Sequence, residues 1–182
     1  MSPVFTIDFE ASCLPWHGRS FPVEVGVAGP QGLVRSWLIR PAPAWEGWTW
    51  TEEAEALHGL SFARLVREGV PADEVLGELV DVLDGQPAYA DSYLDERWMR
   101  TLEAAAGAPP LVRVRHIDAL LETLGVGKDE VRRALEAVNQ LPIGRHRAGE
   151  DARWLQALVS RLQPPVGPPA EAKARDKVAA LA

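Results

Sequence analysis

Acidic residues occur in three short segments that lie far apart in the chain and that a packed core would not accommodate. The segments are residues 6–10 (TIDFE), 90–95 (ADSYLD) and 146–152 (HRAGEDA). Converging carboxylates are costly to bury unless a cation offsets their mutual repulsion and their loss of hydration. The pattern therefore predicts a divalent metal site, and a pair of bound metals usually serves phosphoryl transfer.

The elements that carry these acids must also orient them. Alternation along a strand puts Asp8 and Glu10 on one side, about 6–7 Å apart along the backbone, where two carboxylates can share a cation. His146 and Asp151 are five residues apart, about 140° around a helix, so they share no helix face. They converge only if His146 lies in the loop before a helix and Asp151 lies in its first turn. The helix dipole also favours an acid there, so Asp151 taken alone has a structural explanation.

The three motifs, in this order, resemble those of the DEDDh 3'-5' exonuclease superfamily. Asp8-x-Glu10 is similar to the family's first motif. Residues 90–95 are similar to its second motif, which commonly reads HNA-x-FD, and His146-x(4)-Asp151 to its third. Asp-x-Glu alone arises often by chance, whereas three motifs in order and at suitable separations are specific.

The resemblance extends between the motifs, because residues 57–61 (LHGLS) are similar to the family's connector, and it covers nearly all of residues 3–162. It implies an RNase H-like fold and a metal-dependent 3'-5' exonuclease that releases nucleoside 5'-monophosphates. In its terms, two Mg²⁺ or Mn²⁺ ions are held by four carboxylates, His146 is the general base, and three residues bind substrate. The carboxylates are those of Asp8, Glu10, Asp95 and Asp151, and the substrate-binding residues are Ala11, Ser12 and His58. Oxygen ligands suit these hard cations, and histidine exchanges protons near neutral pH.

The second motif departs from the family pattern. Ala90 and Asp91 stand where a His-Asn pair is common, so two aspartates compete for the metal role. Alignment favours Asp95, which precedes the apolar face of the following helix. Asp91 has a structural alternative, because its side chain can cap that helix by accepting first-turn amides.

The order of elements predicts an α/β fold. Three strands come first, and strands then alternate with helices, which is typical of a mixed sheet with helices on its faces. We expect a five-stranded sheet of the RNase H-like class, an exonuclease domain over residues 1–162, and a proline-rich linker and flexible tail over 163–182. The predicted strands are 4–9, 22–28, 33–39, 87–90 and 111–114, and the predicted helices begin at 51 and 71 or cover 93–106, 117–124, 128–139 and 148–162.

Composition limits the partners and the compartment. The 182 residues carry a formal charge of −7, so the chain lacks the basic surplus that drives sequence-independent duplex binding. We therefore expect a short single-stranded RNA or DNA 3' end, or one delivered by a partner. No stretch is apolar and long enough to span a membrane, and the start does not read as a signal peptide. The single cysteine, Cys13, fits a buried thiol in a reducing cytoplasm.

Two other functions remain open at this stage. One is a non-catalytic nucleic-acid- or protein-binding module with the same fold, against which the complete acidic set argues. The other is an RNase H-like endonuclease, against which the His146-x(4)-Asp151 spacing argues. A DFEASC run favours RNA slightly, because it resembles the DFEATC of some exoribonucleases. The tryptophans at 45, 48 and 50 either stack on bases or cover the edge of the sheet or a partner surface.

Overall fold

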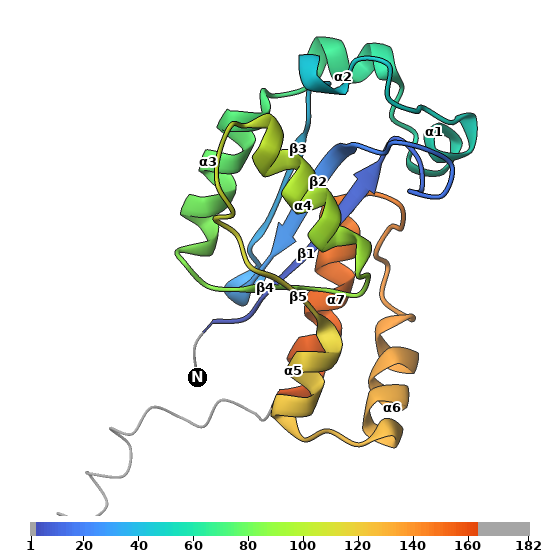
Figure 1. Ribbon diagram of the computed structural model, residues 1–182. Coiled ribbons are helices and arrows are strands. Elements are labelled where there is room, and N and C mark those ends of the chain that lie inside the picture. The colour runs from blue at the N-terminus through green and yellow to red at the C-terminus, as the bar shows by residue number, and fades with distance from the viewer. Residues whose placement is uncertain (1–2, 164–182) are drawn as a thin grey trace, which may run out of the picture.

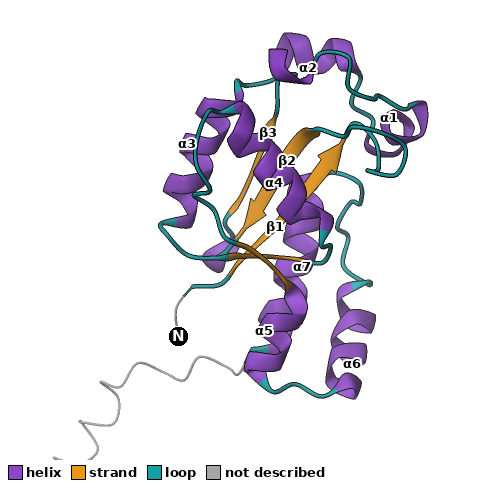
Figure 2. Ribbon diagram, viewed as in Figure 1, coloured by secondary structure: helices purple, strands orange, loops and turns teal. Residues whose placement is uncertain are grey.

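The computed structural model describes residues 3–163, which form one mixed sheet and seven α-helices (Figures 1 and 2). The strand order is β3-β2-β1-β4-β5, in which β2 pairs antiparallel with β1 and β3, and β4 pairs parallel with β1 and β5. This confirms the five-stranded mixed sheet and the RNase H-like class. The strands are β1 Phe5–Ala11, β2 Pro22–Ala28, β3 Val34–Leu38, β4 Ala88–Ala90 and β5 Val114–His116. The helices are α1 Glu52–His58, α2 Phe62–Glu68, α3 Ala72–Leu83, α4 Leu94–Ala105, α5 Ile117–Leu124, α6 Lys128–Val138 and α7 Ala148–Leu162.

Helices cover both faces of the sheet, as predicted (Figure 1). Ile7 and Phe9 of β1 point into the larger core, which α3 and α4 complete. The residue before Ile7 faces the other way, since Thr6 Oγ1 donates a hydrogen bond of 2.7 Å to the carbonyl of Ala152 in α7. Beyond α7, a second core joins that helix to α5 and α6. Asp8 and Glu10 follow the alternation of Thr6 and therefore lie toward α7.

Two element predictions were wrong. We expected two helices between the third and fourth strands, but three are present. Gly59 ends α1 in the left-handed conformation at φ 70°, and Ser61 Oγ then accepts the amide of Arg64 to begin α2. Leu57, in the last turn of α1, is 57% exposed.

The last strand was predicted at 111–114 but is β5, Val114–His116. The amides of Leu111 and Val112 instead donate to Glu103 Oε1 of α4, at 2.7 and 2.9 Å. A buried side chain therefore takes up the backbone donors that a strand would have used, which periodicity cannot reveal.

The tryptophan loop packs over the edge of the sheet. Trp45 is buried and stacks on Phe21 with ring centroids 5.2 Å apart, while Trp48 and Trp50 pack against the main core. Cys13 is buried, as expected. Within residues 3–163, no helix combines the length and apolarity needed to cross a membrane. The predicted linker and tail lie outside the described residues, apart from residue 163.

Candidate active site

The predicted acids converge where β1 and β4 end, beside the N-terminal ends of α4 and α7. They form two groups, Asp8–Asp91–Asp95 and Asp8–Glu10–Asp151, and within each group carboxylate oxygens lie within 4.8 Å of one another. Asp8 belongs to both. The carboxyl ends of parallel strands are the usual position of ligands in open α/β sheets. The tertiary structure therefore gathers all four predicted metal ligands and adds Asp91.

Asp95 is the most deeply buried of these acids, with 1% of its surface exposed. Its Oδ1 accepts the amide of Phe9 at 3.2 Å, whereas its buried Oδ2 has no hydrogen-bond partner in residues 3–163. The amide of Leu94 is bound by Ser92 Oγ at 3.1 Å, and the Asp91 carboxylate accepts none of the first-turn amides of α4 in the described chain. The capping role considered for Asp91 is therefore wrong.

Asp151 lies in the first turn of α7 and His146 lies in the preceding loop, the arrangement that their spacing requires. Asp151 Oδ2 accepts the backbone amides of His146 and Arg147 at 2.6 and 3.2 Å. Its Oδ1 lies 2.5 Å from Nε of Arg145. His146 has φ 63°, and its exposed imidazole forms no hydrogen bond or ion pair with any residue from 3 to 163. Only the backbone of His146 therefore contacts Asp151.

A buried ion pair that the sequence analysis missed holds the start of α7 against β2. Glu24, 1% exposed, accepts two hydrogen bonds from the Arg147 guanidinium at 2.8 and 2.9 Å and a third from the amide of Ala148 at 3.1 Å. Glu24 also lies directly opposite Glu10 in the β1–β2 register, so Arg147 offsets the repulsion between the two. The missed signal was an acid inside the apolar run PVEVGVA, the same feature that marked Asp8 and Glu10.

The backbone of α7 also approaches β2 unusually closely. A Cβ atom added to Gly26 would lie 2.2 Å from the backbone of Ala148 and 2.3 Å from that of Gly149. Only glycine at position 26 permits this contact, which brings Asp151 to Glu10.

Burial and mutual repulsion make these carboxyl groups unusually basic. The pKa of Glu10 is raised to about 8, mainly by burial and then by Asp151. Burial, followed by the charge of Asp91, raises the pKa of Asp95 to about 8. The pKa of Asp8 is raised well above its usual range, first by burial and then by Asp95. In the metal-free protein near neutral pH, protons therefore partly neutralise the cluster.

The donor set fits hard divalent cations. All converging ligands are carboxylates, the type that Mg²⁺ and Mn²⁺ prefer, and the metal-binding groups in residues 3–163 contain no cysteine or histidine. The partnerless Oδ2 of Asp95 is a buried oxygen that a cation would satisfy.

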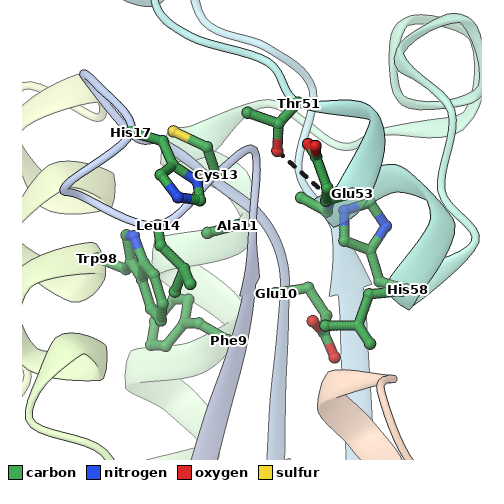
Figure 3. A pocket seen from close by; sticks show the side chains of 12 residues that line it. Phe9, Glu10, Ala11, Cys13, Leu14, His17, Thr51, Glu53, His58 and Trp98 are labelled. Atoms are coloured by element: carbon green, nitrogen blue, oxygen red, sulfur yellow. Dashed lines mark hydrogen bonds between the residues drawn. The ribbon is translucent and has the colours of Figure 1, made fainter.

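A pocket of about 170 Å³ opens beside Glu10 (Figure 3). Leu14, His17 and Trp98 form one side and Thr51, Glu53 and His58 the other. His17, which carried no signal in the sequence, is thus a pocket residue. The lining of the pocket is mostly apolar, as is usual for small-molecule sites.

The three predicted substrate-binding residues have different surroundings. Ala11 and His58 line the pocket, but Ser12 is fully buried and its Oγ accepts the amide of Phe21 at 3.1 Å. His58 Nδ1 accepts the amide of Leu60 at 3.0 Å, so the proton of the neutral ring is on Nε2. That Nε2 lies near the Ala11 backbone without a well-aligned hydrogen bond to residues 3–163, and burial lowers the pKa of His58. Burial therefore favours the neutral ring, and its Nε2 is itself buried behind the pocket wall.

Comparison with solved structures identifies the fold. A full-length 3'-exonuclease matches with a TM-score of 0.67 and 17% identity over 88% of this chain. E. coli exonuclease I bound to a dA16 oligonucleotide matches with a TM-score of 0.63 and 13% identity over 90% of this chain. The cell-death related nuclease CRN-4 matches with a TM-score of 0.57 and 15% identity over 88% of this chain. The chain has the fold of these exonucleases. It spans 60%, 42% and 63% of their respective lengths. No model of a protein family and no curated protein matches the sequence.

Proposed function

We propose that this chain is a metal-dependent 3'-5' exonuclease that hydrolyses single-stranded nucleic acid from its 3' end and releases nucleoside 5'-monophosphates. The observation that carries the proposal is the convergence of Asp8, Glu10, Asp95 and Asp151 into two oxygen-donor groups that share Asp8. Such a cluster beside an apolar pocket suits an enzyme that holds a terminal nucleotide while its phosphodiester is cut.

The chain's own residues divide the work. Asp8 would contact both ions, Glu10 and Asp151 one of them, and Asp95 the other. When bound, the ions supply an activated water nucleophile and stabilisation of the leaving 3' oxygen.

The pocket would receive the terminal nucleotide. Phe9, Ala11 and the ring of His58 line the pocket and would contact that nucleotide. The net charge of −7 disfavours long duplex substrates, which supports a short or single-stranded end. One solved neighbour is described as bound to a DNA oligonucleotide and another as recognising a histone mRNA stem-loop, so both RNA and DNA are candidate substrates.

We assign the proton acceptor to His146. It is the histidine nearest in sequence to Asp151, and the loop that carries it begins the helix bearing that ligand. Because its ring is exposed, the loop must turn the imidazole toward the ions when substrate binds. General bases are often poorly aligned in proteins without substrate.

The test is cleavage of 5'-labelled RNA and DNA oligomers with Mg²⁺, Mn²⁺ or EDTA. The proposal predicts a ladder that shortens from the 3' end, release of 5'-monophosphates, loss of activity in EDTA, and no cleavage of a circular single strand. Cleavage of the circle would instead indicate an endonuclease. Binding without cleavage under all metal conditions would favour the non-catalytic module. Asp151→Asn, checked for folding by circular dichroism, serves as the inactive control.

A further inference from the structure

The strand register brings Asp91 to the cluster. In the parallel β1–β4 pair, Thr6 lies opposite Tyr89. Two residues farther along each strand direction, Asp8 and Asp91 come side by side, and their carboxylate oxygens lie within 4.8 Å of each other and of Asp95. The position of Asp91 is therefore a consequence of the sheet, although its side chain is exposed.

Neighbouring side chains hold the backbone of Asp91 in place. His116 Nε2 lies 3.0 Å from the carbonyl oxygen of Asp91, and His116 Nδ1 accepts the amide of Asp118 at 3.3 Å. Tyr93 stacks on the His116 ring, with centroids 4.0 Å apart and planes 6° from parallel. One neutral tautomer of His116 satisfies both hydrogen bonds, so the segment entering α4 is fixed without any contribution from the Asp91 carboxylate.

The Asp91 carboxylate has no structural role in the described chain. It forms no hydrogen bond or ion pair with residues 3–163, and Ser92 Oγ, not Asp91, accepts the amide of Leu94 at the start of α4. Beside it, Oδ2 of Asp95 is buried and partnerless. Carboxylate oxygens of Asp8, Asp91 and Asp95 nevertheless lie within 4.8 Å of one another. A structural role leaves unexplained why a third acid faces Asp8 and the buried Asp95.

We infer that Asp91 is a metal ligand, and that Asp8, Asp91 and Asp95 hold one divalent cation in the free protein, separately from the cation held by Asp8, Glu10 and Asp151. The inference rests on the proposed function, which it deepens by assigning a fifth carboxylate to the metal centre.

The test is a Mn²⁺ titration of metal-free protein without nucleic acid. Binding is measured by isothermal titration calorimetry and by the loss of the electron paramagnetic resonance signal of free Mn²⁺. We expect two ions in the wild type. In Asp91→Asn, one ion should bind about tenfold or more weakly while the other is unchanged, and Asp91→Ser should behave alike. Glu10→Gln should weaken the other ion. Glu96→Gln removes an exposed carboxylate next to Asp95 but outside both groups, so it should keep both affinities.

Binding of a single ion by the wild type, or unchanged Mn²⁺ binding in Asp91→Asn, would overturn the inference. So would equal weakening in Glu96→Gln, because that result would show a general charge effect. The nuclease assay separates this test from the proposed function. If two ions bind and Asp91→Asn weakens one of them but no nucleic acid is cleaved, the proposed function is refuted and the metal site stands. If nucleic acid is cleaved but Asp91→Asn leaves Mn²⁺ binding unchanged, the role of Asp91 is refuted and the proposed function stands.

Discussion

The two halves of the carboxylate cluster are stabilised in different ways. The α7 half is Asp8, Glu10 and Asp151, and the α4 half is Asp8, Asp91 and Asp95. On the α7 side, arginines offset the acids: Arg145 contacts Asp151, and Arg147 pairs with Glu24 while its charge lowers the pKa of Glu10. On the α4 side, the polar groups of residues 3–163 that act on Asp95 are backbone amides and other carboxylates. The α7 half is therefore partly neutralised by the protein itself, whereas the α4 half depends on protons or a bound cation. Substitutions of the arginines should therefore change folding stability, whereas substitutions of the carboxylates should change metal binding.

The largest effect is expected where the halves meet. Asp8→Asn removes the ligand common to both groups, so cleavage should fall by at least about 10³-fold, the upper range for loss of one transition-state-stabilising group. Both Mn²⁺ affinities should weaken in the same titration, while the metal-free protein should melt at a higher temperature because repulsion is relieved. Weakening of only one ion would show that Asp8 is not shared.

Loss of the proposed base, His146, should slow the chemical step without weakening metal binding. His146→Ala should slow single-turnover cleavage by roughly 10²–10⁴-fold, the usual contribution of a general base. Because its imidazole contacts no carboxylate in the described chain, both Mn²⁺ affinities should match those of the wild type. An unchanged rate would remove His146 from the mechanism.

The buried ion pair of the α7 half should contribute to folding. Arg147→Met leaves Glu24 buried without a cation and opposite Glu10, and should lower the free energy of unfolding by about 3 kcal/mol, measured by urea denaturation. Arg153→Met is the matched control on the same helix, because its partner Glu150 is 40% exposed and its loss should cost under about 1 kcal/mol. Equal losses in the two variants would show that Arg147 has no special structural role.

Both halves should make stability depend on pH, because the α7 half contains Glu10 and the α4 half contains Asp95. Acids with raised pKa values hold protons in the folded state that the unfolded chain has already released, so unfolding releases protons between about pH 4 and pH 8. The contribution of Glu10 and Asp95 to the stability of metal-free protein should therefore fall as pH rises through this window and level off above about 8. Asp95→Asn should flatten the decline, visible as a rise in melting temperature of about 4 °C at pH 8 for roughly 1–2 kcal/mol. Saturating Mn²⁺ should stabilise the wild type most at high pH. A melting temperature that rises from pH 5 to 8 without metal would contradict the raised pKa values.

The smallest effect concerns Arg145, whose guanidinium is close enough to Asp151 to compete with a cation. Its side chain is 47% exposed, so the ion pair is worth under about 1 kcal/mol. Arg145→Gln should therefore raise Mn²⁺ affinity at the Glu10–Asp151 group by up to about fivefold. The ion at the Asp91–Asp95 group should be nearly unaffected, and Arg153→Gln should change neither affinity. Lower affinity in Arg145→Gln would show that the arginine supports the ion site.

Local patterns were sufficient wherever a property depends on residues close together in the chain. Alternation correctly placed Asp8 and Glu10 on one side of β1, and helical spacing correctly separated His146 from Asp151. The element order predicted the mixed sheet and its covered faces. The extra helix α2 and the shift of β5 were missed because a left-handed glycine and the side chain of Glu103 decided them, and neither feature alters hydrophobic periodicity.

The remaining properties depend on contacts between distant segments. The sequence marked Glu24 as an acid in an apolar strand, but only packing paired it with Arg147, 123 residues away. The sequence left Asp91 between two roles, and the parallel register of β1 and β4 then set it beside Asp8. Side-chain chemistry and local spacing are properties of the sequence, so the candidate residues and the side of the strand or helix on which they lie could be predicted. Desolvation and charge–charge repulsion depend on which segments meet in space, so the raised pKa values and the division of the cluster into two halves were decided by the tertiary structure alone.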